Sequence, residues 1–126
     1  MSNALLEDRT PTADEIQGAL ASFVDSVRTH YGSRIVDIVL FGSRARGDHR
    51  QHSDADVAVI LKDGDWRFWA EKLRLADLTY DQLMEFGLRI QPWPISASAW
   101  LDPASHHNPR LVEVMKREGY SLQVPA

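Results

Sequence analysis

The feature that most constrains the fold of this 126-residue chain is a pair of short apolar runs joined by a polar stretch that contains glycine. The first run, residues 34–41, is rich in β-branched side chains, and the second, residues 54–61, is apolar after an acidic start. The pair Gly42-Ser43 ends the first run abruptly. Runs of this length between turn residues predict two strands, the second of them buried on both faces of a sheet. The polar stretch between them, residues 44–53, predicts a loop with one helical turn.

Helical periodicity flanks these two strands. Thr12 and Glu15 form a capping-box pattern, and the apolar spacing after them predicts a helix from residue 13 to about residue 31. Apolar residues recur at the same spacing from Trp66 to Phe86 and predict one long helix, with Trp66 and Trp69 in the core. Asn108 followed by proline predicts the start of a last helix over residues 109–118.

A third strand is predicted over residues 88–96, where Pro92 and Pro94 stand two positions apart. Proline cannot donate to a strand ladder, so this strand is expected at a sheet edge or with a bulge. A short tail strand is expected within residues 120–124. Together these elements predict an α/β fold with a single mixed β-sheet flanked by helices. One domain over residues 1–126 is expected, with residues 1–11 as a loose N-terminal arm.

Charge and composition narrow the functional classes. The net charge of −4 argues against general nucleic-acid binding, which needs many phosphate contacts. Basic side chains nevertheless gather within residues 44–52, and a confined basic patch suits one small polyanion. Cysteine is absent, no signal pattern opens the chain, and no apolar run is long enough for a membrane span, so a cytoplasmic protein is expected.

The turn after the first strand has the properties of a phosphate site. Without a Cβ, Gly42 lets a phosphate approach the backbone, and Ser43 adds a hydroxyl donor. Arg44 and Arg46 could add charge-assisted hydrogen bonds, although a solvated surface position suits them equally well. A Walker loop is excluded because Asp48 stands where that motif needs lysine.

The start of the second strand carries two carboxylates, Asp54 and Asp56. Residues two apart on a strand point to the same face, so the two carboxylates lie close together and repel unless a cation lies between them. Mg²⁺ commonly bridges one or two protein carboxylates to substrate phosphates. The sequence therefore predicts a site for Mg²⁺ and a nucleoside triphosphate, with the two aspartates as catalytic residues and metal ligands.

The run Gly42-Ser43-Arg44, followed by Gly47 and then by Ser53-Asp54-x-Asp56, resembles the polymerase-beta-type nucleotidyltransferase superfamily. It is most similar to the minimal members, which are often partners of HEPN-domain proteins in toxin–antitoxin pairs. The resemblance implies a nucleotidyltransferase fold and transfer of a nucleoside monophosphate from a nucleoside triphosphate, ATP being the expected one, to an acceptor hydroxyl. By this resemblance Gly42 and Ser43 would hold the triphosphate, and the full set of predicted nucleotide-binding residues is Gly42, Ser43, Arg44, Arg46 and Ser53.

Active members of that superfamily carry a third carboxylate on a later strand, and this chain departs from the pattern. Residues 88–96 contain no acid, and Arg89 and Gln91 occupy the positions where one is expected. Neither side chain can act as a base or as an anionic ligand. Two hypotheses follow: a magnesium-dependent nucleotidyltransferase that modifies an acceptor such as a partner toxin, or a weakly active or inactive antitoxin-like partner of a HEPN-domain protein.

Overall fold

The computed structural model describes residues 10–123, so most of the predicted N-terminal arm lies outside the described part. The strands are β1 (Ile35–Phe41), β2 (Ala55–Leu61), β3 (Ile90–Ser96) and the short β4 (Tyr120–Ser121). The α-helices are α2 (Ala13–Tyr31), the single turn α3 (Ser43–Arg46), α4 (Phe68–Leu78), α5 (Tyr80–Phe86), α6 (Ala97–Leu101) and α7 (Pro109–Glu118). Two 3-10 turns, η1 (Gly32–Arg34) and η2 (Pro103–Ser105), complete the order.

The strands form one mixed sheet in the order β3-β2-β1-β4. Strand β1 pairs antiparallel with β2 and with β4, whereas β2 and β3 are parallel. In this register Asp56 of β2 lies between Phe41 of β1 and Gln91 of β3. The prediction of a single mixed sheet flanked by helices is confirmed. The register also brings the polar start of β2 beside the end of β1 and the start of β3.

Strand β3 is an edge strand, as its two prolines predict. Pro92 lies opposite Val57 and Pro94 lies opposite Val59 in the parallel pairing with β2. Residues two apart direct their backbone groups to the same side, so both prolines place their missing N–H on the outer side of the sheet. The intervening residues make the ladder to β2, and no bulge is needed.

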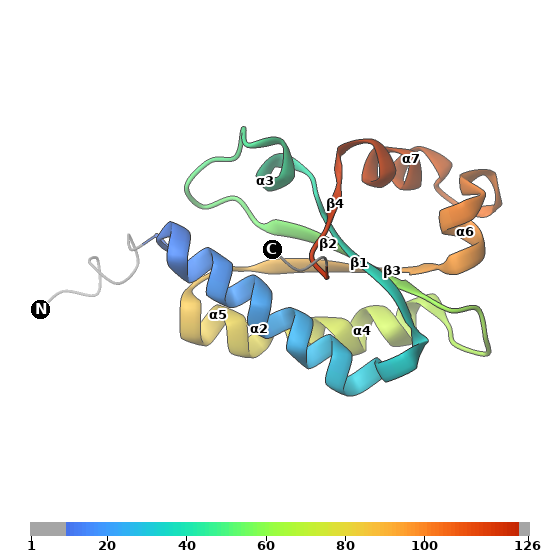
Figure 1. Ribbon diagram of the computed structural model, residues 1–126, viewed down its shortest axis with the longest axis horizontal. Coiled ribbons are helices and arrows are strands. Elements are labelled where there is room, and N and C mark those ends of the chain that lie inside the picture. The colour runs from blue at the N-terminus through green and yellow to red at the C-terminus, as the bar shows by residue number, and fades with distance from the viewer. Residues whose placement is uncertain (1–9, 124–126) are drawn as a thin grey trace, which may run out of the picture.

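Helices cover both faces of the sheet (Figure 1). Helices α2, α4 and α5 pack on one face, where the larger group of buried residues includes Phe23 and Leu75. Helices α6 and α7 pack on the other, over a smaller group that includes Ile60 and Met115. Because side chains alternate along β2, Asp56 lies on the same face as Ala58 and Ile60, the face of α6 and α7.

The prediction of one long helix from Trp66 to Phe86 is wrong in its continuity. Helix α4 begins at Phe68, and Thr79 separates it from α5. The Thr79 hydroxyl donates to the Ala76 carbonyl at 2.6 Å, and its backbone N–H bonds to the same carbonyl at 3.1 Å. Such local bonds compete with the regular helical pattern and produce a break.

The buried face of these helices also differs from the prediction. Glu71, Leu75 and Gln82 are buried, whereas Trp69 is exposed, so the prediction that Trp69 belongs to the core is wrong. Trp66 is half-buried against the larger core group, in agreement with its predicted place. Tyr31 explains the burial of an acid, because its hydroxyl donates to Glu71 at 2.8 Å inside the layer between α2 and α4.

No helix within residues 10–123 has the length and apolar character that crossing a bilayer requires.

Candidate functional site

The turn at the end of β1 is shaped by a glycine that no other residue replaces without strain. Gly42 has φ +79°, in the left-handed region, and its carbonyl accepts the backbone N–H groups that start the turn α3. A Cβ added at Gly42 would lie 2.5 Å from Asp56 Oδ2. The missing side chain therefore leaves room for the Asp56 carboxylate directly beside the turn that begins with Ser43.

The two predicted carboxylates lie together at the start of β2. Asp56 is half-buried, and its pKa is raised, first by burial and then by the negative charge of Asp54. The charges of Lys72 and Arg46 and the indole N–H of Trp93 lower that pKa and so oppose the increase. Without a bound cation, it is thus unfavourable for both aspartates to be ionised at once, as expected for two carboxylates that share a site.

The position beside Asp54 and Asp56 on β3 is taken by an amide. Gln91 lies opposite Asp56 in the register, and its Nε2 donates to Asp54 Oδ2 at 3.1 Å. Arg89 Nε lies 3.9 Å from Asp54 Oδ1. Both side chains that stand where a third carboxylate is expected therefore contact Asp54, and both supply donors where an acid would supply an acceptor.

Lys72 of helix α4 brings a positive charge to the edge strand β3. Its ammonium donates to the carbonyl of Pro92 and lies 4.1 Å from the centroid of the Trp93 ring. Burial lowers the pKa of Lys72, and the charge of Asp56 acts against that decrease. The indole N–H of Trp93 is buried and lies near enough to the Asp56 carboxylate to lower its pKa. Lys72 and Trp93 therefore place two hydrogen-bond donors beside Asp56.

The two arginines of the turn are engaged within the protein. Arg44 is buried, and its Nε donates to the Ser53 carbonyl at 2.9 Å, which ties α3 to the loop before β2. Burial lowers the pKa of Arg44, and the charge of Asp54 opposes this. Arg46 is exposed and pairs with Asp48 at 3.0 Å and with Glu118 of α7 at 2.8 Å.

The loop before β2 borders a shallow cavity that reaches Asp54. Ser53 Oγ accepts the backbone N–H of Arg50 at 2.8 Å, which closes the turn just before the aspartates. A depression of about 190 Å³ is lined by residues that include Arg44, His52, Ser53 and Asp54. A phosphate or a sugar could therefore approach Asp54 from the side of this loop.

A family model described as nucleotidyltransferase domain matches residues 20–100, which include the Gly42 turn, both aspartates and Gln91. The chain belongs to the nucleotidyltransferase family.

Three proteins of Methanocaldococcus jannaschii, each named "Putative protein adenylyltransferase", resemble this nucleotidyltransferase domain in sequence. They are 36%, 30% and 35% identical over 57%, 61% and 39% of this chain. The matches cover 65%, 52% and 50% of those proteins, so the chain matches less than two thirds of each relative's length.

Solved structures support the fold of this nucleotidyltransferase domain. A "putative nucleotidyltransferase" from Sulfolobus solfataricus aligns with a TM-score of 0.55 at 16% identity, over 85% of this chain and 80% of that one. A chain in the crystal structure of a toxin–antitoxin with AMP-PNP aligns with a TM-score of 0.57 at 19% identity, over 84% and 73% of the two chains. At such identities the likeness concerns the fold alone.

The acid pair of this nucleotidyltransferase domain suits a hard cation that is shared with a substrate. Asp54 and Asp56 could supply two oxygen ligands, the number with which proteins usually hold Mg²⁺ when phosphates and water complete its shell. A cation between them would relieve the repulsion by which Asp54 raises the pKa of Asp56. Within residues 10–123 no group of three or more His, Cys, Asp or Glu side chains could hold a metal ion. The donor set therefore fits a cation that arrives with a polyphosphate.

Lys72 and Trp93 are the parts of this nucleotidyltransferase site that the sequence does not predict. Lys72 comes near Asp56 because α4 packs against β3, and Trp93 does so because β3 pairs with β2; neither contact has a local signature. The sequence does indicate that Gln91 stands where an acid is expected, and the structure adds its bond to Asp54.

Proposed function

We propose that this chain binds a nucleoside triphosphate with Mg²⁺ and transfers the nucleoside monophosphate to an acceptor hydroxyl. Gly42 and Ser43 would hold the triphosphate, and Asp54 and Asp56 would hold the cation. The observation that carries the proposal is the contact between the turn and the acid pair. Only the absence of a Cβ at Gly42 makes room for Asp56, so the phosphate turn and the carboxylates share one space.

The reaction needs positioning and charge stabilisation more than covalent help from the protein. The acceptor oxygen bonds to the α-phosphorus, the bond to the β-phosphate oxygen breaks, pyrophosphate leaves, and the hydroxyl proton passes to solvent. Bound Mg²⁺ would neutralise the charge on the phosphates during this step. Ser43 would donate to a phosphate oxygen, while Lys72 and the Trp93 N–H offer further donors beside Asp56.

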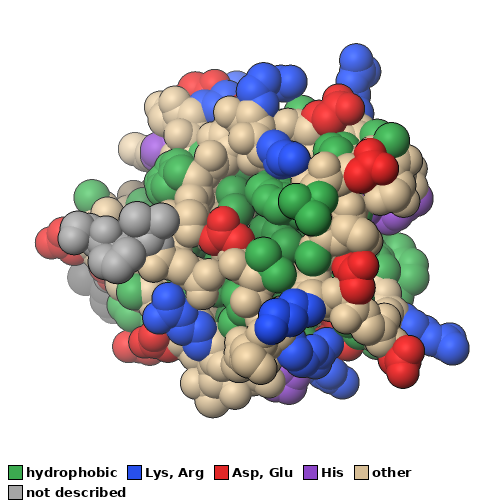
Figure 2. Space-filling model, turned by 45° about the vertical axis from the view of Figure 1, so that its right-hand side comes forward, with side chains coloured by type: hydrophobic (Ala, Val, Ile, Leu, Met, Phe, Trp, Pro, Cys, Tyr) green, Lys and Arg blue, Asp and Glu red, His purple; other side chains and the backbone are tan. Residues whose placement is uncertain are grey.

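The protein's relatives suggest the donor and the acceptor. Sequence relatives named protein adenylyltransferases point to ATP as donor and a protein side-chain hydroxyl as acceptor. On the face in Figure 2, basic and acidic side chains surround an apolar centre that also carries an acidic side chain, and no continuous basic band crosses this face as a long nucleic acid would need.

Calorimetry with each ribonucleoside triphosphate at millimolar magnesium tests binding directly. The wild-type chain should bind at least one of them, ATP foremost, and binding should disappear when magnesium is chelated. The double variant Asp54→Asn plus Asp56→Asn should not bind. The proposal fails if no triphosphate binds to the wild type, or if the double variant binds as tightly.

A second candidate function is that of an antitoxin-like partner of a HEPN-domain protein, with a weakly active or inactive site. The observation that favours it is the donor character of Gln91 and Arg89, which leaves the described site without a third carboxylate. The fold that this chain shares with a chain of a toxin–antitoxin structure is consistent with such a role.

Incubation with labelled triphosphate, magnesium and a HEPN-domain protein encoded beside this chain separates the two candidates. Label transferred to that protein by the wild type, and lost in the Asp54→Asn plus Asp56→Asn variant, supports the enzyme. Co-purification and neutralisation of toxicity that survive in the double variant, without label transfer, support the binding partner.

A further inference from the structure

Helices α4 and α5 expose a continuous apolar stripe to solvent. Trp69, Leu73, Tyr80 and Met84 are 71%, 66%, 61% and 65% exposed, and the small exposed Ala76 lies between them. Spacings of three and four residues place Trp69, Leu73 and Ala76 on one face of α4, and Tyr80 and Met84 on one face of α5. The stripe therefore crosses the break at Thr79 and is formed by two short helices. Isolated exposed apolar residues are ordinary, whereas a contiguous row of them marks an interaction site.

The chemistry of the stripe suits a protein partner. Trp, Tyr and Met are enriched where proteins meet, because they bury large areas and adapt to irregular surfaces. The opposite side of the same helices packs on α2 and β3, so most of the surface of the stripe is left uncovered in this fold. An exposed apolar surface formed by adjacent helical faces is complementary to the apolar face of another helix.

A row of carboxylates runs beside the stripe. Asp77, Asp81 and Glu85 each follow a stripe residue directly in sequence and recur every four residues. No ion pair joins these three acids to a cation of the described residues. Leu78, next after Asp77, lines the groove between α4 and α2. The acidic row therefore lies on the α2 side of the stripe.

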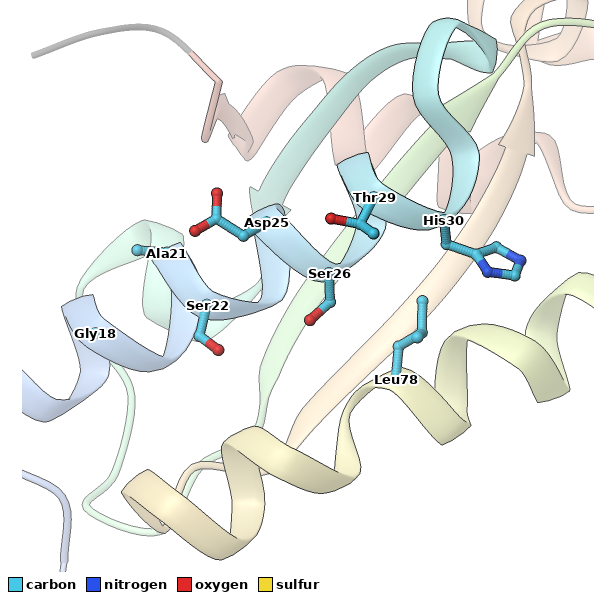
Figure 3. Close-up of a pocket in the computed structure, with 8 residues that line it drawn as sticks. All are labelled: Gly18, Ala21, Ser22, Asp25, Ser26, Thr29, His30 and Leu78. Carbon is cyan, nitrogen blue, oxygen red and sulfur yellow. The ribbon is translucent and has the colours of Figure 1, made fainter.

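The groove itself carries a further acid on its far wall. It has a volume of about 750 Å³ and is lined mainly by small residues of α2, with Leu78 from α4 opposite them. Figure 3 shows Ser22 and Ser26 of α2 pointing to the side of Leu78, whereas Asp25, between them in sequence, points to the other side of the helix. The cations on α4 are already engaged, Arg74 with Glu71 at 3.3 Å and Lys72 over the Trp93 ring.

The acidic row beside the stripe distinguishes between a second copy of this chain and a different protein as the partner that covers it. In an antiparallel pair of identical helices, the acidic row of one copy would lie against the acidic row of the other, which is repulsive. In a parallel pair, the acidic row of one copy would face the other flank of the stripe of the second copy, where the cation is Lys72. The Lys72 ammonium already donates to the Pro92 carbonyl and lies over the Trp93 ring. A different protein with Lys or Arg beside its apolar face would avoid the repulsion between acidic rows and would not depend on Lys72.

We infer that the stripe and its acidic row bind an amphipathic helix of a different protein, one whose apolar face is bordered by Lys or Arg. The stripe lies on α4 and α5, outside the proposed nucleotide site. The inference therefore concerns protein binding and not the nucleotide reaction. Helix α4 also carries Lys72, whose charge lowers the pKa of Asp56, so a partner bound there lies on a helix that influences the acid pair.

Two synthetic peptides of about 18 residues test the inference on the full chain. Both have the same leucine face, and one carries Lys on its flanks while the other carries Glu. Labelled Lys peptide should saturate with a Kd of about 10 µM or tighter, and the Glu peptide should bind at least about tenfold more weakly. Binding of the Lys peptide should weaken with added salt, because it depends on exposed charges. Equal binding of the two peptides, or none, would overturn the inference.

Matched variants locate the site. Leu73→Lys should reduce Lys-peptide affinity at least about tenfold, since it places a charge within the apolar row. Leu101→Lys, on α6 and even more exposed at 80%, should bind as the wild type does. Asp77→Lys plus Asp81→Lys should reverse the preference between the peptides. Loss in Leu101→Lys equal to that in Leu73→Lys would contradict the assignment.

Other occupants give distinct results. A dimer in light scattering that becomes monomeric in Leu73→Lys would assign the stripe to a second copy and overturn the inference. Binding of uncharged phosphatidylcholine vesicles that Leu73→Lys abolishes would assign it to a lipid surface, with the same consequence. The Asp54→Asn plus Asp56→Asn variant should bind the Lys peptide normally, so failure of this inference and failure of nucleotide binding are distinguishable.

Discussion

At the scale of single residues, Gly42 and Gln91 lie against the two aspartates and set the character of the site. Gly42 admits Asp56 by having no side chain, and Gln91 holds Asp54 through an amide donor. The first contact brings the turn at Gly42 against Asp56. The second occupies the position from which a further acid would strengthen a cation site. Each contact can be changed by one substitution without removing an aspartate.

Gly42→Ala should abolish nucleotide binding and destabilise the protein. The new Cβ would meet Asp56 Oδ2 at 2.5 Å, and the left-handed backbone adds about 1–2 kcal/mol of strain. Gly47→Ala is a matched control, because Gly47 has φ +84° and open space around it. That variant should share the strain but keep the affinity for magnesium and ATP, as calorimetry would show. Equal affinity in both variants would remove Gly42 from the site.

Gln91→Glu should strengthen cation binding. A carboxylate next to Asp54 and Asp56 adds a hard oxygen ligand, and without metal it adds repulsion. The melting temperature should fall in chelator and rise more than that of the wild type when Mn²⁺ is added. Gln17→Glu, the same change at an exposed position of α2, should show neither effect. An unchanged response to Mn²⁺ would show that β3 does not face the cation.

Asp56→Asn should stabilise the protein in the absence of metal near neutral pH. The pKa of Asp56 is raised from its ordinary value of 3.8 by burial and by Asp54, so the folded state binds this proton more tightly than the unfolded state does. Ionisation of Asp56 therefore lowers the free energy of unfolding. This loss of stability is absent at low pH and grows as pH rises from 3.8 through the raised pKa. Thermal melts should show the largest gain at pH 7 and a shrinking gain toward pH 4. Asp65→Asn, at an exposed turn position, should show no such trend.

At the scale of elements, local signals account for where most helices and strands begin and end. The capping box of α2 is present as predicted, with Thr12 Oγ1 accepting the Glu15 N–H at 3.1 Å and Glu15 accepting the Thr12 N–H at 3.0 Å. Asn108 caps α7 by accepting the Leu111 N–H at 3.3 Å. These bonds join residues three apart, so the sequence alone suffices to predict them.

Thr12→Ala should weaken the start of α2. Loss of the hydroxyl leaves a terminal N–H without its partner, which costs about 1 kcal/mol. The melting temperature should fall by about 4 °C in a domain of this size. Thr29→Ala, at an exposed interior position of the same helix, should cause no loss, since alanine favours helix more than threonine does. A Thr12→Ala melt that matches the wild type would mean that the cap adds no stability.

The break between α4 and α5 shows where element-level reasoning fails. Apolar spacing in this segment predicts an apolar face correctly, but that face is exposed, and the buried face carries Glu71 and Gln82. Each of these polar residues finds a partner on α2: Glu71 accepts from Tyr31, and Gln82 donates to Ser22 at 3.1 Å. Periodicity identifies a stripe but does not say whether this chain or another protein covers it.

At the scale of the whole molecule, contacts between distant parts of the chain complete the site. Arg46 of α3 pairs with Glu118 of α7, 72 positions later, and α4 reaches around β3 to place Lys72 near Asp56. These contacts decide which cations remain free for a ligand. Arg44 is committed to the loop carbonyl of Ser53, whereas Arg46 is exposed and could exchange its partners for a phosphate.

Substitutions at the two ends of the Arg46–Glu118 pair should separate these roles. Arg46→Gln should weaken binding of magnesium and ATP, because a phosphate loses a charge-assisted donor. Glu118→Gln removes the competing carboxylate and should leave affinity unchanged or higher. Calorimetry on both variants decides the matter. If both lose affinity equally, the pair acts only by holding α3 against α7.

Local sequence patterns are sufficient to predict the two strands around Gly42-Ser43, the acid pair at the start of β2, an edge or a bulge at the proline strand, and the resemblance to the family. These depend on patterns within a few residues, where backbone geometry and side-chain chemistry act directly. The folded chain adds that Lys72 and Trp93 lie near Asp56, that Gln91 bonds Asp54, and that the apolar row on α4 and α5 faces solvent. Such outcomes depend on which surfaces pack together, and packing is a property of the whole chain that local patterns do not encode.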